Sequence, residues 1–171
     1  MIQVPINRSH IEVAQAKSAE MGVLKNSVTE GDGNIAGFVG ELLVAEHISG
    51  EVCNTYDYDV LLDGVRIDVK TKRAKFQPYP HFDCSIMGFN TSQDCDYYYF
   101  ARIKTDFTVA WLLGAYPKEL YFKDAILHKA GSVDKSNNFT FKADCYNLAI
   151  HKLKQLTKEK NGTDDYWCIH K

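Results

Sequence analysis

The sequence lacks several features that would assign it to common classes of protein. It has no apolar run near the roughly 20 residues needed to cross a bilayer, and its first ten residues lack the apolar core of a secretory signal. No glycine-rich loop followed by lysine is present, so ATP use is not indicated. These absences favour a non-membrane protein that needs no nucleotide cofactor.

Paired cysteines are also missing. The five cysteines are odd in number, widely spaced and without a C-x-x-C pair, which indicates reduced thiols and an intracellular, cytoplasmic location. His81, Cys84 and Cys95 match the spacing of no familiar zinc module. We therefore expect neither a disulfide framework nor structural zinc.

An excess of positive charge is lacking as well. The 171 residues carry 20 lysines and arginines against 22 aspartates and glutamates, for a formal net charge of -2. There is no overall basic field to attract nucleic acid, so any such contact must be local. The length suits one compact domain over residues 1–171 rather than two.

Periodicity and turn signals predict a mixture of helices and strands. A capping pattern, Ser9 with Glu12, predicts an N-terminal helix over about 10–25, and helical spacing predicts a second over about 34–48. Further along the chain we expect a long loop or lid at about 74–96, strands at 97–103 and 107–116, and a C-terminal strand and helix within about 136–160. Residues 117–131 fit either a short helix or irregular structure.

A hairpin is predicted in "YDYDVLLDGVRIDVKTKR", residues 56–73. Asp63-Gly64 is a strong signal for a type I′ turn, since both central positions need positive φ. With this turn Leu62 pairs with Val65, and the pairing continues outward in steps of one residue on each strand. The expected pairs are Leu62 with Val65, Leu61 with Arg66, Val60 with Ile67, Asp59 with Asp68, Tyr58 with Val69, and Asp57 with Lys70.

Side chains of this hairpin would divide between an apolar face and a charged one. On the charged face Asp59 and Asp68 would lie opposite each other with Cβ atoms about 5 Å apart, which is repulsive without a cation. Mg²⁺ or Mn²⁺ would meet that need, since these ions prefer carboxylate and water oxygens. Lys70 projects from the same face. A solvated hairpin face would show similar alternation, but it would more readily pair aspartate with lysine than with aspartate.

The order of these residues resembles the PD-(D/E)xK nuclease superfamily. A helix glutamate, a strand aspartate and a (D/E)-x-K strand are matched by Glu41 in "GNIAGFVGELLVAEHI", Asp59 in "YDYDV" and Asp68-Val69-Lys70 in "RIDVKTK". The family core of helix, three-stranded antiparallel meander, helix and further strand can be laid on residues 33–115. Tyr58 stands where the motif name has proline, which leaves Asp57 as a competitor to Asp59.

The resemblance implies an α/β (α+β) fold with a restriction-endonuclease-like core. Its central mixed β-sheet would contain the antiparallel hairpin at 57–72 and be flanked by helices. It also implies roles: Asp59, Asp68, the Val69 carbonyl and Glu41 would hold Mg²⁺ or Mn²⁺, and Lys70 would position and help activate the attacking water. The implied activity is metal-dependent hydrolysis of phosphodiester bonds, as an endonuclease or exonuclease of a phage or bacterial system, in the host cytoplasm if it is phage-encoded.

DNA is the expected substrate. Lys72, Arg73 and Lys75 continue from the strand of Lys70 and are the candidates for phosphate contacts. In the loop that follows, Tyr79, His81 and Phe82 either stack on bases or pin the loop to the core. A homodimer would suit double-strand cutting. The alternative is a non-catalytic module on the same fold that binds nucleic acid or protein.

Overall fold

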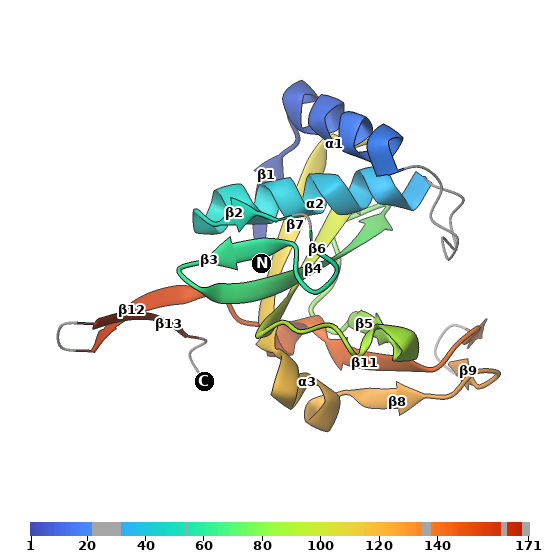
Figure 1. Ribbon diagram of the computed structural model, residues 1–171. Coiled ribbons are helices and arrows are strands. Elements are labelled where there is room, and N and C mark those ends of the chain that lie inside the picture. The colour runs from blue at the N-terminus through green and yellow to red at the C-terminus, as the bar shows by residue number, and fades with distance from the viewer. Residues whose placement is uncertain (22–31, 54, 135–137, 162–163, 169–171) are drawn as a thin grey trace.

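The computed structural model describes residues 1–21, 32–53, 55–134, 138–161 and 164–168. A six-stranded mixed sheet, in the order β1-β7-β6-β4-β3-β2, forms its centre (Figure 1). The strands of this sheet are β1 Ile2–Pro5, β2 Glu51–Val52, β3 Val60–Leu62, β4 Val65–Ala74, β6 Tyr97–Lys104 and β7 Val109–Pro117. Neighbouring strands are antiparallel except β4 and β6, which are parallel. The predicted mixed α/β class is confirmed at this level.

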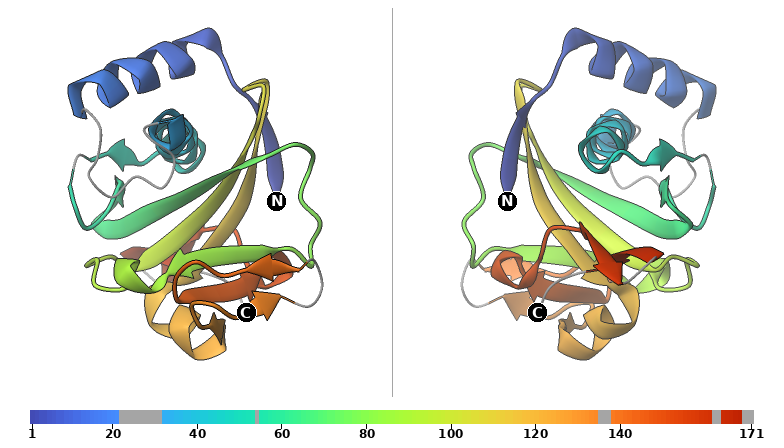
Figure 2. Two further views of the ribbon diagram at one scale, coloured as in Figure 1. Left: turned by 90° about the vertical axis from the view of Figure 1, so that its right-hand side faces the viewer. Right: turned by 90° about the vertical axis from the view of Figure 1, so that its left-hand side faces the viewer.

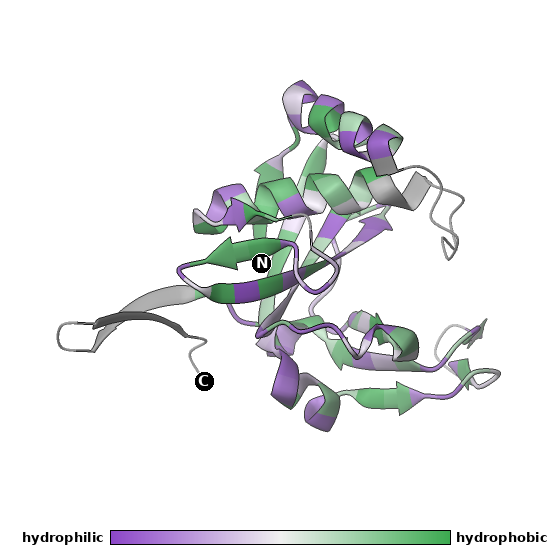
Figure 3. Ribbon diagram, in the orientation of Figure 1, coloured by the Kyte–Doolittle hydropathy of each residue, from purple (hydrophilic) through white to green (hydrophobic). Residues whose placement is uncertain are grey.

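Two helices cover one face of the sheet. They are α1 Arg8–Met21 and α2 Asp32–Ile48. Figure 2 shows α2 end-on, between α1 and the sheet. α2 is apolar over most of its surface (Figure 3), as expected for a helix covered on two sides. The predicted helix at 34–48 is confirmed, and the N-terminal one begins near its predicted start; residues 22–25 of the latter lie outside the described residues.

The other face of the central sheet carries a smaller sheet in the order β5-β11-β8, together with α3. Its elements are β5 Asp83–Met87, α3 Lys118–Asp124, β8 Ile126–His128 and β11 Cys145–Ala149. The remaining elements are the 3-10 helices η1 Gly88–Asn90 and η2 Ile150–Lys152, and the two-stranded pairs β9 Val133–Asp134 with β10 Phe139–Thr140 and β12 Thr157–Asn161 with β13 Asp164–Cys168. Among the described residues, no helix is long and apolar enough to cross a membrane.

Alternating side chains of the central strands build two apolar cores, one on each face. Ile67 and Val69 of β4 belong to the first core, with Val39 and Leu43 of α2. The second core lies on the opposite face and includes Tyr98, Phe100, Trp111, Tyr121 and Leu148. β4 is therefore covered on both sides, and its polar residues Asp68 and Lys70 lie on the face of the second core rather than in open solvent.

The predicted turn and the inner part of the hairpin are confirmed. Asp63 and Gly64 have φ of 48° and 85°. The register runs from Leu62 with Val65 to Val60 with Ile67, as predicted. The antiparallel meander β2-β3-β4 is also present.

Two predictions about later segments are wrong. The loop predicted at 74–96 contains β5 and η1, and the helix predicted in 144–160 is replaced by β11, η2 and β12. β11 has only five residues, CYNLA, which do not show the strict alternation of apolar and polar side chains that distinguishes a strand from a helix. The family resemblance would place an α-helix between the meander and β6, where these residues instead supply β5 and η1.

Close packing of α2 on β4 depends on Gly40. A Cβ added at Gly40 would lie 2.0 Å from Thr71 Oγ1 and 3.0 Å from Thr71 Cβ. We expect Gly40→Ala to lower the free energy of unfolding by about 1–3 kcal/mol, since overpacking forces the helix away from the sheet. Urea unfolding measures this loss.

The partner variant is Thr71→Ala, which removes a buried hydroxyl that has no hydrogen bond within the described residues. The double variant should recover part of the loss, because the two residues are in contact. Equal stability of Gly40→Ala and wild type would contradict this account of the packing.

Candidate active site

The candidate site lies where β3 and β4 separate. Within the described residues, their pairing ends at Val60 with Ile67, and Asp59 N then donates to Ile67 O at 3.0 Å. At the next position of β4 the Asp59 side chain replaces the backbone of β3 as the hydrogen-bond acceptor: Asp59 Oδ2 accepts a hydrogen bond from Val69 N at 2.7 Å. A carboxylate thus caps the free edge of β4 immediately beside Asp68.

The predicted outer pairs of the hairpin do not form. Thr55 Oγ1 accepts from Tyr58 N and donates to Tyr58 O, so the chain turns before it reaches β3. Asp57 Oδ1 accepts a hydrogen bond from Asp94 N at 3.1 Å instead of pairing with Lys70. Asp57 therefore serves this local structure, and the expectation that it is the partner of Lys70 is wrong.

Asp68 and Lys70 form the inner part of the site on β4. Asp68 is 2% exposed, and Lys70 Nζ lies 2.6 Å from its Oδ2. This approach lies outside the angles of a hydrogen bond, so Asp68 Oδ2 accepts none within the described residues. Burial of a carboxylate oxygen in this way is costly unless a cation fully compensates it.

Gln93 fixes the position of Lys70. Its Oε1 accepts from Lys70 Nζ at 2.9 Å, and its Nε2 donates to Tyr56 O at 3.2 Å. Lys118 Nζ donates to the Gln93 carbonyl. The segment that carries Gln93 is tied to β4 by Arg66, which bonds both Asp94 and Asp96. The ammonium group of Lys70 is therefore held by several contacts rather than free to rotate.

Glu41 reaches the site from α2, and Lys17 approaches it from α1. Lys17 Nζ lies 3.6 Å from Glu41 Oε2 and 5.0 Å from the centre of the Phe38 ring. Burial raises the pKa of Glu41, Lys17 opposes that rise, and the charge of Asp68 adds to it. Glu41 and Asp68 thus interact although they come from different elements.

The electrostatics of Asp59 connect all three carboxyl groups. Burial raises the pKa of Asp59 to about 8, with further increases from Glu41 and from the charge and hydrogen bond of Asp68. The Val69 N–H opposes this rise by stabilising the charged form. Asp59 and Asp68 therefore lie close together, although not as the strand pair that the register predicted, and without an added cation the raised pKa of Asp59 favours its protonated form at neutral pH.

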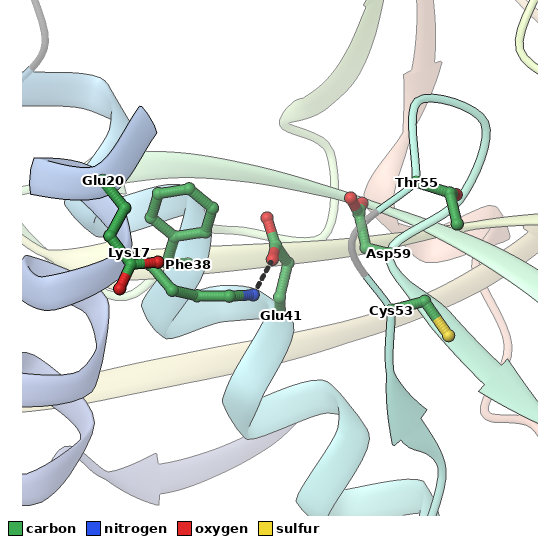
Figure 4. Close-up of a pocket in the computed structure, with 7 residues that line it drawn as sticks. All are labelled: Lys17, Glu20, Phe38, Glu41, Cys53, Thr55 and Asp59. Carbon is green, nitrogen blue, oxygen red and sulfur yellow. Dashed lines mark ion pairs between the residues drawn. The ribbon is translucent and has the colours of Figure 1, made fainter. Parts of the chain in front are cut away.

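A pocket of about 350 Å³ opens beside these residues (Figure 4). Glu41 from α2 and Asp59 from the segment before β3 stand on two sides of it, and Lys17 extends from α1 to pair with Glu41 (Figure 4). The residues that line it are Lys17, Glu20, Phe38, Glu41, Cys53, Thr55 and Asp59. A small charged group can therefore approach Glu41 and Asp59 from solvent, whereas Asp68 is buried and does not line the pocket.

Comparison with known families finds no family model that matches this chain, and no curated protein is similar in sequence. The geometry and chemistry of the side chains are therefore the basis for a functional proposal.

The donor set suits a hard divalent cation, although its carboxylates are not yet arranged around one. In the part of the chain that the structure describes, no group of three or more histidine, cysteine, aspartate or glutamate side chains forms a ready metal cage. The ammonium groups of Lys17 and Lys70 instead lie against Glu41 and Asp68. Carboxylate oxygens are nevertheless the ligands that Mg²⁺ and Mn²⁺ prefer, and the raised pKa of Asp59 indicates that the nearby ammonium groups do not fully compensate its charge.

The predicted nucleic-acid contacts lie further along β4. Lys72 and Arg73 are exposed on opposite faces of the strand, and Lys75 is exposed just after it. Lys72 shares the face of Lys70 and neighbours Arg102 in the parallel ladder. Partial burial of its ammonium group and the like charge of Arg102 lower the pKa of Lys72.

Sequence reasoning missed Lys17 and Gln93. Lys17 lies in an amphipathic helix where lysine is common, and Gln93 lies in a polar segment without periodicity. Each reaches the site only because of how its segment packs on α2 or β4. No local sequence pattern distinguishes either residue, whereas Glu41, Asp59, Asp68 and Lys70 are all predicted by motif order.

Proposed function

We propose that the protein is a metal-dependent nuclease that hydrolyses phosphodiester bonds, with DNA as its substrate. The observation that carries this proposal is the arrangement of the carboxylates around β4: Glu41 and Asp59 line one pocket, Asp59 accepts a hydrogen bond from Val69 N, and the neighbouring Asp68 pairs with Lys70. The order of Glu41, Asp59 and Asp68-Val69-Lys70, which resembles the motif of the PD-(D/E)xK superfamily, supports the same activity. We also propose an intracellular location, which suits the four free thiols among the described cysteines.

Each group of the site has a role in this proposal. Asp59, Asp68 and Glu41 would hold Mg²⁺ or Mn²⁺ with the Val69 carbonyl, and their negative charge would be neutralised as it bound. A bound ion lowers the pKa of water and polarises a phosphoryl oxygen. Lys70, held by Gln93, would donate a hydrogen bond that orients the attacking water in line with the scissile bond.

Lys17 and Lys70 would exchange partners when the cation and substrate enter. Both ammonium groups now neutralise carboxylates, and both would become available to the phosphate as the cation replaced them. A lysine in such a position stabilises the negative charge that develops on the phosphoryl oxygens. The two lysines would thus compensate the carboxylates before binding and assist the reaction afterwards.

Cleavage assays test the proposal directly. Purified protein is incubated with supercoiled plasmid, linear duplex and single-stranded DNA in Mg²⁺ or Mn²⁺, with EDTA as the control. We expect cleavage of at least one substrate, its loss in EDTA, and a rise in melting temperature with Mn²⁺ because the ion binds only the native site. Failure to cleave any of them, with no metal-induced stabilisation, would contradict it.

The ion pairs favour one second candidate, a non-catalytic binding module. With Lys17 on Glu41 and Lys70 on Asp68, the acidic groups are already partly neutralised without a metal. Such a module would bind DNA or a protein with the same affinity in EDTA and in Mg²⁺. DNA binding that is insensitive to metal, without cleavage, would favour it over the nuclease.

A further inference from the structure

A group of aromatic side chains follows the basic end of β4. Phe76 and Tyr79 are 58% and 57% exposed, and the centres of their rings lie 6.4 Å apart. His81 is also exposed, and its ring stacks on Tyr79 with centres 5.6 Å apart and planes inclined by 10°. Phe82 contacts both rings edge-on, at 5.3 Å and 5.0 Å. We name Phe76, Tyr79, His81 and Phe82 the aromatic platform.

The platform is held in place from beneath. Phe82 packs against the second core, while Ile150 N and His151 N donate to Phe82 O and Pro80 O, each at 2.8 Å. Phe82 N also donates to Tyr79 O at 3.0 Å. Of the two roles predicted for these aromatics, pinning the loop therefore belongs to Phe82. Tyr79 and His81 remain presented to solvent on a fixed base, which lowers the entropic cost of binding a ligand.

Positive charge borders the platform. Arg73 and Lys75 immediately precede Phe76, and within the described residues neither forms an ion pair with a carboxylate. Lys152 is exposed on the segment that holds Pro80. Exposed rings beside unpaired cations match a ligand with flat bases and a phosphate backbone.

The platform and the proposed active site lie on one path. Ala74 lies on the same strand as Lys70 and Lys72, at its end. Ala74 and Phe82 both pack against the second core, so the end of β4 and the base of the platform meet there. Phe76 lies six residues after Lys70, a separation of at most about 20 Å in extended chain. A single strand of several nucleotides could therefore reach from the lysine to the rings.

We propose that the aromatic platform binds unpaired bases of single-stranded DNA, so that the substrate, or the part of it held next to the scissile bond, is single-stranded. Bases in a duplex are stacked within the helix and cannot lie on Tyr79, whereas an unpaired base can. The link to cleavage depends on the proposed nuclease function, but binding of single strands by the platform does not.

Fluorescence anisotropy with a labelled oligothymidine and a hairpin duplex of equal length tests the platform in EDTA, where no cleavage can interfere. We expect Tyr79→Ala and Phe76→Ala each to weaken single-strand binding about 5- to 100-fold, as the loss of one stacked base predicts, and to change duplex binding less than about 2-fold. Tyr79→Trp should retain affinity because it keeps a stacking surface. Phe89→Ala, which removes a ring of similar exposure (60%) outside the platform, is the matched control and should bind as wild type does.

The outcomes separate the two proposals. Unchanged single-strand affinity in Tyr79→Ala and Phe76→Ala, or an equal loss on single strand and duplex, would overturn the platform even if the protein cleaves duplex DNA in Mg²⁺. Single-strand binding that depends on Tyr79 in a protein that cleaves nothing would support the platform and contradict the nuclease. Melting temperatures of all variants should match wild type, since the altered rings are exposed.

Discussion

Replacement of Lys70 by methionine is expected to slow Mg²⁺-dependent cleavage by about a thousandfold or more. Methionine keeps the length of the side chain but removes the ammonium group that Gln93 fixes beside Asp68. Loss of one positioned charge or proton donor at the reacting centre commonly costs about 10²–10⁴ in rate. Single-turnover cleavage with saturating protein measures the effect on the chemical step.

Lys72→Met is the matched control, because it removes an exposed lysine from the same face of β4 two residues further on. It should weaken substrate binding and lower its salt dependence while leaving the single-turnover rate within about tenfold of wild type. Lys70→Met should also bind Mn²⁺ at least as tightly as wild type in calorimetric titrations, since no ammonium group then competes for Asp68. Equal cleavage rates for Lys70→Met and wild type would remove Lys70 from the site.

Asp59→Asn should make the metal-free protein more stable above neutral pH, although it destroys the proposed activity. Native Asp59 has its pKa raised to about 8 from an ordinary value of 3.8, so the folded state binds this proton more tightly than the unfolded state does. The contribution of Asp59 to stability is therefore fully present below about pH 4 and is lost as pH rises toward 8. An asparagine oxygen can still accept from Val69 N, yet it carries no charge for Glu41 and Asp68 to repel.

Urea unfolding at pH 5 and pH 8 in EDTA measures this difference. At pH 8 we expect Asp59→Asn to exceed wild type by about 1–3 kcal/mol, and the fall between the two pH values to be reduced. The fall is not abolished, since burial also raises the pKa of Glu41. Asp57→Asn should keep the wild-type dependence. If Asp59→Asn is less stable than wild type at pH 8, or if its stability depends on pH as strongly as that of wild type, then Asp59 is not destabilised by burial beside Glu41 and Asp68.

Local signals were sufficient to predict the elements that build the site. The Asp63-Gly64 turn determines the register of β3 on β4, and the apolar spacing of α2 places Glu41 on the helix that covers this strand. Motif order predicts Asp59, Asp68 and Lys70 as members of one site. The register failed only beyond Val60, where Thr55 turns the chain and a side chain replaces a strand pair.

The errors lie where tertiary context determines local structure. β11 is a run of five residues, CYNLA, with neither clear strand alternation nor a helical stripe, and its pairing with β5 and β8 decides that it is a strand. β5 lies between proline-containing and glycine-containing segments that suggest a loop, yet its buried Cys84 and Ile86 complete the second sheet. Lys17 and Gln93 could not be predicted for the same reason, since nothing in their own segments specifies what they contact.

The most direct test of the central claim compares wild type with Asp68→Asn, purified identically, on single-stranded and duplex oligonucleotides in Mg²⁺. Asp68 is the most buried of the three carboxylates and the one whose oxygen lacks a hydrogen bond within the described residues. The account predicts that wild type cleaves and that Asp68→Asn shows no detectable cleavage and a smaller metal-induced rise in melting temperature. Equal cleavage by the two proteins, or none by wild type on either substrate, would contradict it.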